Sequence, residues 1–111
     1  MSEFTEFEGL WHIYEMELWD ADYFNMEVQA FIEIDSKGVG EFQFGLVRGS
    51  LDIDEIGGDG RMEFTWSGSD ENDEAFGSGW LELKDKNTLK GKIKFHQGDK
   101  SKFSAKRIEN E

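Results

Sequence analysis

Apolar and polar residues alternate with a period of two along most of the chain, a pattern typical of strands with one buried face. In residues 26–34, apolar side chains occupy every even position from Met26 to Ile34. In residues 89–96, Leu89 and Ile93 share one face while lysines occupy the other. No segment of helical length shows a convincing 3.6-residue period. The pattern therefore predicts an all-β fold.

Glycine-containing turns separate these segments and set their register. A turn at residues 36–38 places Ile32 opposite Phe42, and a turn at 48–49 places Phe44 opposite Ile53. The glycine-rich stretch 57–60 then brings Leu51 opposite Trp66. Further along, the expected features are a long acidic loop at residues 68–75, a turn near 86–87 with Glu82 opposite Lys90, and a last hairpin around 98–100 with Gly91 opposite Arg107.

The count is eight antiparallel strands joined in order, beginning with the apolar stretch of residues 9–20. Such a meander has two edges, and pairing its last strand with its first hides both. We therefore predict an eight-stranded up-and-down barrel, with a two-sheet sandwich as the alternative. In the barrel Arg107 lies beside Trp11 and closes one end by a cation–π contact, with Gly91 leaving room for the guanidinium.

These residues carry a resemblance. The sequence Gly9-Leu10-Trp11 on the first strand, with Arg107 on the last, resembles the signature of the calycin superfamily, the lipocalin-like barrels. The resemblance implies a small barrel in which a basic residue of the final strand covers the Trp of the first strand. The chain departs from lipocalins in lacking cysteine and a C-terminal helix, so their ligands are not carried over.

A narrower resemblance rests on the two ends of the chain. The opening Trp11-His12-Ile13 with Trp19-Asp20, and the ending Phe95-His96 with Gly98-Asp99, are similar to a group of small uncharacterised bacterial proteins. This implies a bacterial origin and no particular activity.

Length and composition favour a single domain spanning residues 1–111 in a reducing compartment. The chain has 111 residues, no cysteine and no proline. It shows no secretory signal and no run of about 20 apolar residues, the length that a membrane span needs. We expect a cytoplasmic protein without a membrane partner.

The charge is strongly negative and unevenly distributed. The formal net charge is −13. Residues 1–83 hold 21 acidic and three basic residues, whereas residues 84–111 hold four acidic and nine basic ones. A surface this negative argues against nucleic acid as a partner.

The loops richest in aromatic and acidic residues fall at the end of the barrel opposite Trp11, and we call this end the mouth. Aromatic and acidic residues between positions 19 and 25 rim it, and Trp66 lines the interior below. Strict alternation from Trp11 also turns Glu15 and Glu17 inward, where either a cation such as Arg48 or water and a ligand would have to reach them. The alternative is a bulged first strand, with Tyr14, Met16 and Leu18 inward and both glutamates in solvent. The candidate ligand-binding residues are Glu15, Glu17, Trp19, Asp20, Asp22, Tyr23, Arg48 and Trp66.

No motif indicates catalysis or a cofactor. The acidic stretch from Asp70 to Glu74 lacks the spacing and the turn glycine of a calcium loop. His12 and His96 fall on strands that are not neighbours, and no nucleophile or phosphate-binding motif occurs. We therefore expect no catalytic residue, metal or cofactor.

A stripe of lysines gives the chain a second candidate surface. Lys90, Lys92 and Lys94 alternate outward on one strand, and Lys102 and Lys106 do so on the next. This face could dock a second copy or another protein, with Phe31 or Trp80 as the apolar anchor.

Two functions follow. The first is non-enzymatic binding of a small ligand at the acidic, aromatic mouth. The second is an acidic protein-interaction module, of an inhibitor or immunity type, that acts through its outer surface. A cavity lined by Trp66, Leu81 and Glu15 would favour the first, and a filled interior would favour the second.

Overall fold

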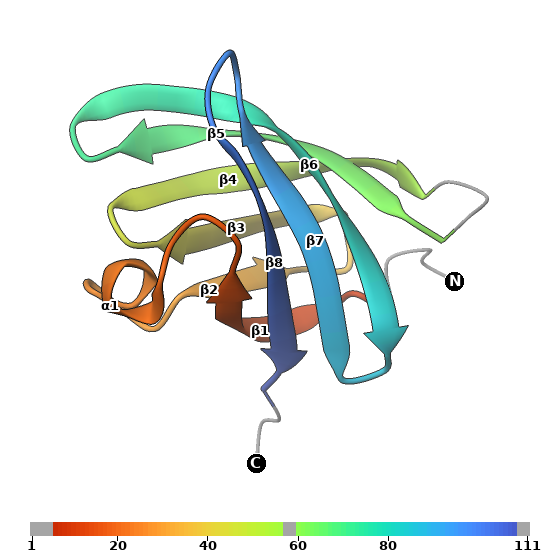
Figure 1. Cartoon of the computed structure of the whole chain (residues 1–111). Helices are drawn as coiled ribbons and strands as arrows, with labels where there is room; N and C mark the ends of the chain where they lie inside the picture. Colours follow the sequence, from red (N-terminus) through yellow and green to blue (C-terminus); the bar gives the residue numbers. More distant parts are fainter. Residues whose placement is uncertain (1–5, 57–59, 109–111) are drawn as a thin grey trace.

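Eight antiparallel strands close into one barrel in this computed structural model (Figure 1). The structure describes residues 6–56 and 60–108, apart from the side chains of residues 54–56. Each strand pairs with the next along the chain, and β8 pairs with β1, so the barrel prediction is confirmed and the sandwich alternative is wrong. The elements are β1 (Gly9–Met16), α1 (Ala21–Phe24), β2 (Phe31–Ile34), β3 (Val39–Phe44), β4 (Val47–Ile56), β5 (Met62–Asp70), β6 (Asp73–Asp85), β7 (Thr88–Phe95) and β8 (Lys100–Arg107).

The closure of the barrel at Trp11 is also confirmed. Trp11 pairs with Arg107 across β1 and β8, and it is fully buried. The guanidinium of Arg107 lies 4.3 Å from the centre of the Trp11 ring. It also donates hydrogen bonds to the backbone carbonyls of Glu6, Glu8 and Lys86, which ties the segment before β1 to the turn after β6.

Several registers agree with the sequence pattern. Ile32 pairs with Phe42, Leu51 pairs with Trp66, and Glu82 pairs with Lys90. In the first two pairs both side chains are buried, as period-two alternation requires of an inward face.

The predicted pairing of Phe44 with Ile53 is wrong. Phe44 pairs with Val47, because the chain turns at Gly45 and Leu46 rather than at residues 48–49. Gly45 has a φ of +59°, a left-handed conformation that glycine adopts without strain. The arginine–glycine pair that suggested a turn lies within β4 instead.

The predicted pairing of Gly91 with Arg107 is also wrong. Gly91 pairs with Phe103, because the last turn centres on Gln97, whose φ is +58°. A Cβ atom at Gly91 would approach the Phe103 ring to 2.7 Å, so this glycine makes room for Phe103 and not for the guanidinium. The glycine beside the guanidinium is Gly9, where an added Cβ atom would lie 3.2 Å from Nη1 of Arg107.

The expected strand at residues 26–34 is shorter than predicted, and the expected acidic loop is not a loop. Only Phe31–Ile34 is a strand, while Met26 and Val28 are exposed. The stretch 68–75 continues β5 and β6 around a tight turn, with Glu71 at a φ of +62°. The four-residue helix α1 was not predicted.

No helix of the described residues is long and apolar enough to cross a membrane.

Candidate functional site

The barrel interior is filled by side chains. The inward residues of all eight strands form one cluster, which includes Trp11, Phe42, Phe64, Trp66 and Leu81. One cavity among these inward side chains measures about 10 Å³ and is lined only by apolar residues. That is about the volume needed for a single water molecule, so the described interior has no room for an organic ligand.

Aromatic rings close the mouth. Trp19 packs on the core with its ring centre 5.1 Å from that of Phe44, 6.3 Å from Phe95 and 6.0 Å from Tyr23. Trp66 lies deeper, 5.1 Å from Phe95, and its indole N–H donates to the carbonyl of Lys94. Trp19 therefore covers the mouth, and Trp66 is part of the packed core.

The remaining rim residues have local structural roles. The Oδ1 atom of Asp20 accepts the backbone N–H of Tyr23 and caps α1, which places Asp22 in its exposed first turn. The Tyr23 hydroxyl accepts the N–H of Leu46, and its ring occupies the space that a side chain at position 45 would need. The sequence did bring these residues to the correct end of the barrel.

Of the two alternatives for Glu15 and Glu17, the inward orientation is wrong. The register of β1 against β8 shifts between Ile13 and Glu15, so that Met16 is buried and both glutamates are exposed. This is the bulged alternative, although Tyr14 and Leu18 also stay exposed. A bulge keeps the two carboxylates out of the apolar interior, where desolvation of each would cost on the order of several kcal/mol.

Arg48 does not approach these glutamates. It is exposed on β4, where it lines a shallow depression of about 340 Å³ on the outside of β3, β4 and β5. The residues proposed as one ligand site therefore do not form a single site. Trp19 covers the mouth, Asp20 caps α1 and Trp66 packs in the interior. Glu15, Glu17 and Arg48 face solvent.

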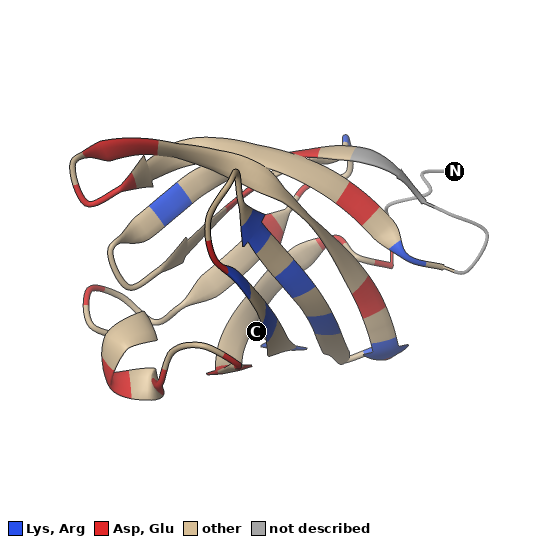
Figure 2. Cartoon of the chain, turned by 45° about the horizontal axis from the view of Figure 1, so that its top comes forward, with Lys and Arg blue, Asp and Glu red and all other residues tan. Residues whose placement is uncertain are grey.

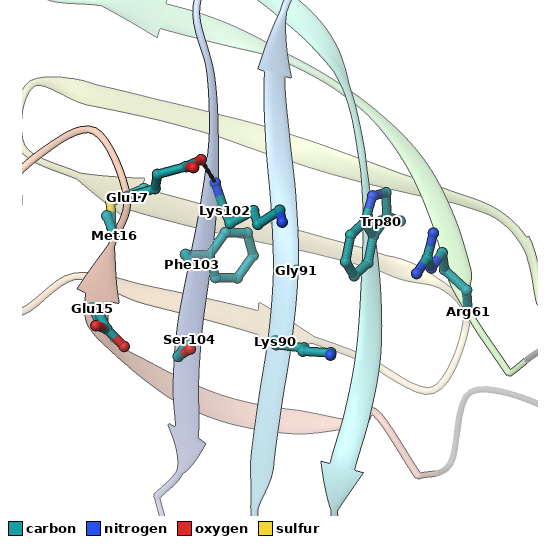
Figure 3. Close-up of a pocket in the computed structure, with 10 residues that line it drawn as sticks. All are labelled: Glu15, Met16, Glu17, Arg61, Trp80, Lys90, Gly91, Lys102, Phe103 and Ser104. Atoms are coloured by element: carbon teal, nitrogen blue, oxygen red, sulfur yellow. Dashed lines mark hydrogen bonds between the residues drawn. The ribbon is translucent and has the colours of Figure 1, made fainter.

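A concave surface of about 490 Å³ lies on the outside of the barrel, and we call it the outer groove. It crosses β1, β8, β7 and β6 and reaches Arg61, which directly precedes β5 (Figure 3). Carboxylates lie at its β1 end, ammonium groups in its middle and an aromatic ring with a guanidinium at its far end. Its lining residues are Glu15, Met16, Glu17, Arg61, Trp80, Lys90, Gly91, Lys102, Phe103 and Ser104.

Trp80 and Arg61 form the far end of the groove. The guanidinium of Arg61 lies 3.8 Å from the centre of the Trp80 ring and its Nη2 atom 3.9 Å from Glu82. Lys90 lies 3.5 Å from the same glutamate. Glu82 therefore forms ion pairs with two cations. One of them is Lys90, the cross-strand partner that the sequence predicts.

The lysine face that borders the groove is crowded with like charge. Lys92 pairs directly with Lys102, and Lys94 with Lys100. Figure 2 shows blue basic bands along β7. The neighbouring β8 also carries basic residues and no acidic one. Among the described residues, no carboxylate lies within 4.0 Å of these four ammonium groups. Facing cations repel each other, so the face is locally unfavourable when nothing covers it.

Two carboxylates have lowered pKa values, and both lie outside the groove. The backbone N–H groups of Val39 and Lys37 lower the pKa of Asp35, and the N–H of Asn87 lowers the pKa of Asp85. Both carboxylates lie in exposed turns and act as turn caps. In the described part of the chain, no three His, Asp or Glu side chains gather closely enough to hold a metal ion. His96 stacks on Phe76 on the barrel exterior.

Sequence reasoning named the lysines and Trp80 but missed Arg61 and Ser104 as neighbours of this surface. The pairing of Met62 with Leu81 brings Arg61 beside Trp80, and no local motif signals that. The outward glutamates of β1 joined the groove only because of the bulge.

Comparison with protein-family models, with curated proteins and with solved structures found no match for this chain. The closed eight-stranded barrel is consistent with a calycin-like fold.

Proposed function

We propose that this protein is a non-enzymatic protein-interaction module that binds its partner through the outer surface of the barrel, at the outer groove. The observation that carries this proposal is the filled interior beneath an aromatic cover. Binding is then left to the outside, where the outer groove borders a face of poorly neutralised cations.

The composition of the groove supports a protein partner. It combines one partly buried tryptophan with charged residues of both signs, and Trp and Arg are enriched at the energetic centres of protein interfaces. The exposed carboxylates on the rest of the barrel would repel other acidic surfaces, which favours one orientation of approach. An inhibitor or immunity type of action fits such a module.

Small-ligand binding at the mouth has less support. A ligand there would have to displace Trp19 from its contacts with Phe44, Tyr23 and Phe95. The carboxylates meant to receive it, Glu15 and Glu17, face solvent.

The proposal keeps two expectations from the sequence. The likeness of the chain ends to small bacterial proteins supports a bacterial origin, and the absence of cysteine supports a reducing compartment such as the cytoplasm.

Site-specific photo-crosslinking in cells of the source organism tests the proposal. A photoreactive residue replaces Ser104 in the groove, and a matched variant carries it at Ser50, an exposed residue of β4. We expect one discrete protein adduct from position 104 and none from position 50. Adducts at neither position, or equal adducts at both, would refute binding through the groove.

A further inference from the structure

We infer that the outer groove takes an extended acidic segment of the partner, with one apolar side chain among its carboxylates. This inference rests on the proposed function and specifies the chemistry of its partner.

The unmatched cations give the first argument. Glu82 pairs with Lys90 and Arg61, but Lys92 and Lys102 face each other with no described carboxylate within 4.0 Å. The same holds for Lys94 and Lys100. Of these four lysines Lys102 lines the groove, and the other three lie on the face that borders it. Carboxylates laid between these strands would replace repulsion by charge-assisted hydrogen bonds.

An apolar anchor gives the second argument. Trp80 lies on the outer face of β6 and is partly buried. The guanidinium carbon of Arg61 lies 3.8 Å from the centre of its ring. Because Gly91 has no side chain, Phe103 contributes to the floor of the groove between β7 and β8 (Figure 3). One apolar side chain of the segment would contact both rings.

The dimensions fit an extended peptide. The groove crosses four neighbouring strands and reaches Arg61, which directly precedes β5, so that four spacings of about 4.8 Å give a length of about 19 Å. Six extended residues, at about 3.3 Å each, span that distance. The segment would cross the strands rather than extend the sheet, because the closed barrel offers no free edge.

The carboxylates of the groove favour a peptide over a nucleic acid. Glu15 and Glu17 close one end of the groove, where they would repel phosphates but can accept peptide N–H groups. A second copy of the chain is also less suitable, since each copy carries a net charge of −13.

A labelled peptide of about eight residues, made of aspartate and glutamate around a central phenylalanine, is the probe, because about six residues fill the groove. Binding is followed by fluorescence anisotropy. Two control peptides replace either the acids by their amides or the phenylalanine by glycine. The test variant is K92Q/K102Q. The matched control is K37Q/K86Q, which removes the same charge from two turns outside the groove.

We expect K92Q/K102Q to weaken binding about tenfold or more, and K37Q/K86Q to change it less than about twofold. Either control peptide should bind at least about tenfold more weakly than the probe. Equal binding by the two variants would show that only net charge matters and would overturn the inference. So would tighter binding of a single-stranded oligonucleotide, or a dimer of the free chain that the test variant abolishes.

Different experimental outcomes would refute the inference and the proposed function. If position 104 yields a protein adduct but the acidic peptide does not bind, the groove contacts a protein surface of another kind and only the inference falls. If position 104 yields no adduct, the proposed function falls whatever the peptide does.

Discussion

Arg107 lies over Trp11 at the closed end of the barrel, with its guanidinium carbon 4.3 Å from the ring centre. Its three hydrogen bonds to backbone carbonyls join the segment before β1, the turn after β6 and the last strand. This contact joins β1 and β8, the first and last strands of the meander.

We expect R107K to destabilise the fold by about 1–3 kcal/mol, because a lysine can neither stack on the indole in the same way nor donate to three separated carbonyls. Urea unfolding gives the change in free energy. The control is R48K, on an exposed side chain of β4, which should change stability by less than about 0.5 kcal/mol. Equal effects of the two variants would refute this joining role.

Gly45 gives a second stability prediction. Its φ is +59°, and an added Cβ would approach the Tyr23 ring to 2.4 Å. Gly60 also has a positive φ of +83°, but a Cβ there would meet nothing within 4 Å. We therefore expect G60A to cost about 1 kcal/mol of backbone strain and G45A about 2 kcal/mol or more, because only G45A adds a steric clash. Equal losses in denaturant unfolding would mean that Tyr23 moves aside freely.

The sequence predicted the fold better than it predicted the site, and the reason is physical. Inward positions follow from period-two alternation, so the strand number and the pairings of Ile32 and Leu51 were correct. Turns depend on a single residue with positive φ. Gln97 takes this role where a turn at Gly98 was expected, and Glu71 takes it where a longer loop was expected. Each misplaced turn shifts a register.

The site depended on one bulge. Alternation predicted Glu15 inward, and the shift after Ile13 reversed it. The outer groove combines four strands and Arg61, so it appears only when the registers that bring them together are known. The lysine alternation was the part of that surface visible in the sequence.

Asp35 makes the turn between β2 and β3 sensitive to acid. Its Oδ1 atom accepts the N–H groups of Lys37 at 2.8 Å and Val39 at 3.1 Å, and these bonds lower its pKa. Since the folded pKa lies below the unfolded one, the ionised carboxylate stabilises the fold fully above its unfolded pKa. That contribution is lost as pH falls through the folded pKa.

We expect D35N to flatten the pH dependence of unfolding below about pH 4, near the ordinary aspartate pKa, and to change little in its slope at neutral pH. NMR titration of the Asp35 carboxyl carbon should give a lower midpoint in the folded protein than in a peptide of the same turn. Coincident midpoints would contradict the role of the two hydrogen bonds.

The facing pair Lys92 and Lys102 predicts an unusual gain of stability. We expect K92E to stabilise the fold by about 0.5–1 kcal/mol, because it turns a repulsive cross-strand pair into an attractive one. The gain should shrink in high salt, which screens exposed charges. K37E, in the turn after β2, adds the same charge without facing a cation across a strand and serves as the control. If K92E destabilises the barrel at low salt, the two lysines do not repel each other in solution.

Trp19 decides whether the mouth can open. Its ring packs on Phe44, Phe95 and Tyr23 above an interior with a cavity of about 10 Å³. We expect W19A to lose about 2–4 kcal/mol of stability and to expose the rings below, so that an apolar fluorescent dye binds the variant more strongly than the wild type. Native mass spectrometry of gently purified wild-type protein should show no bound small molecule. A reproducible extra mass that W19A alters would instead favour a ligand at the mouth, and it would require Trp19 to move when that ligand binds.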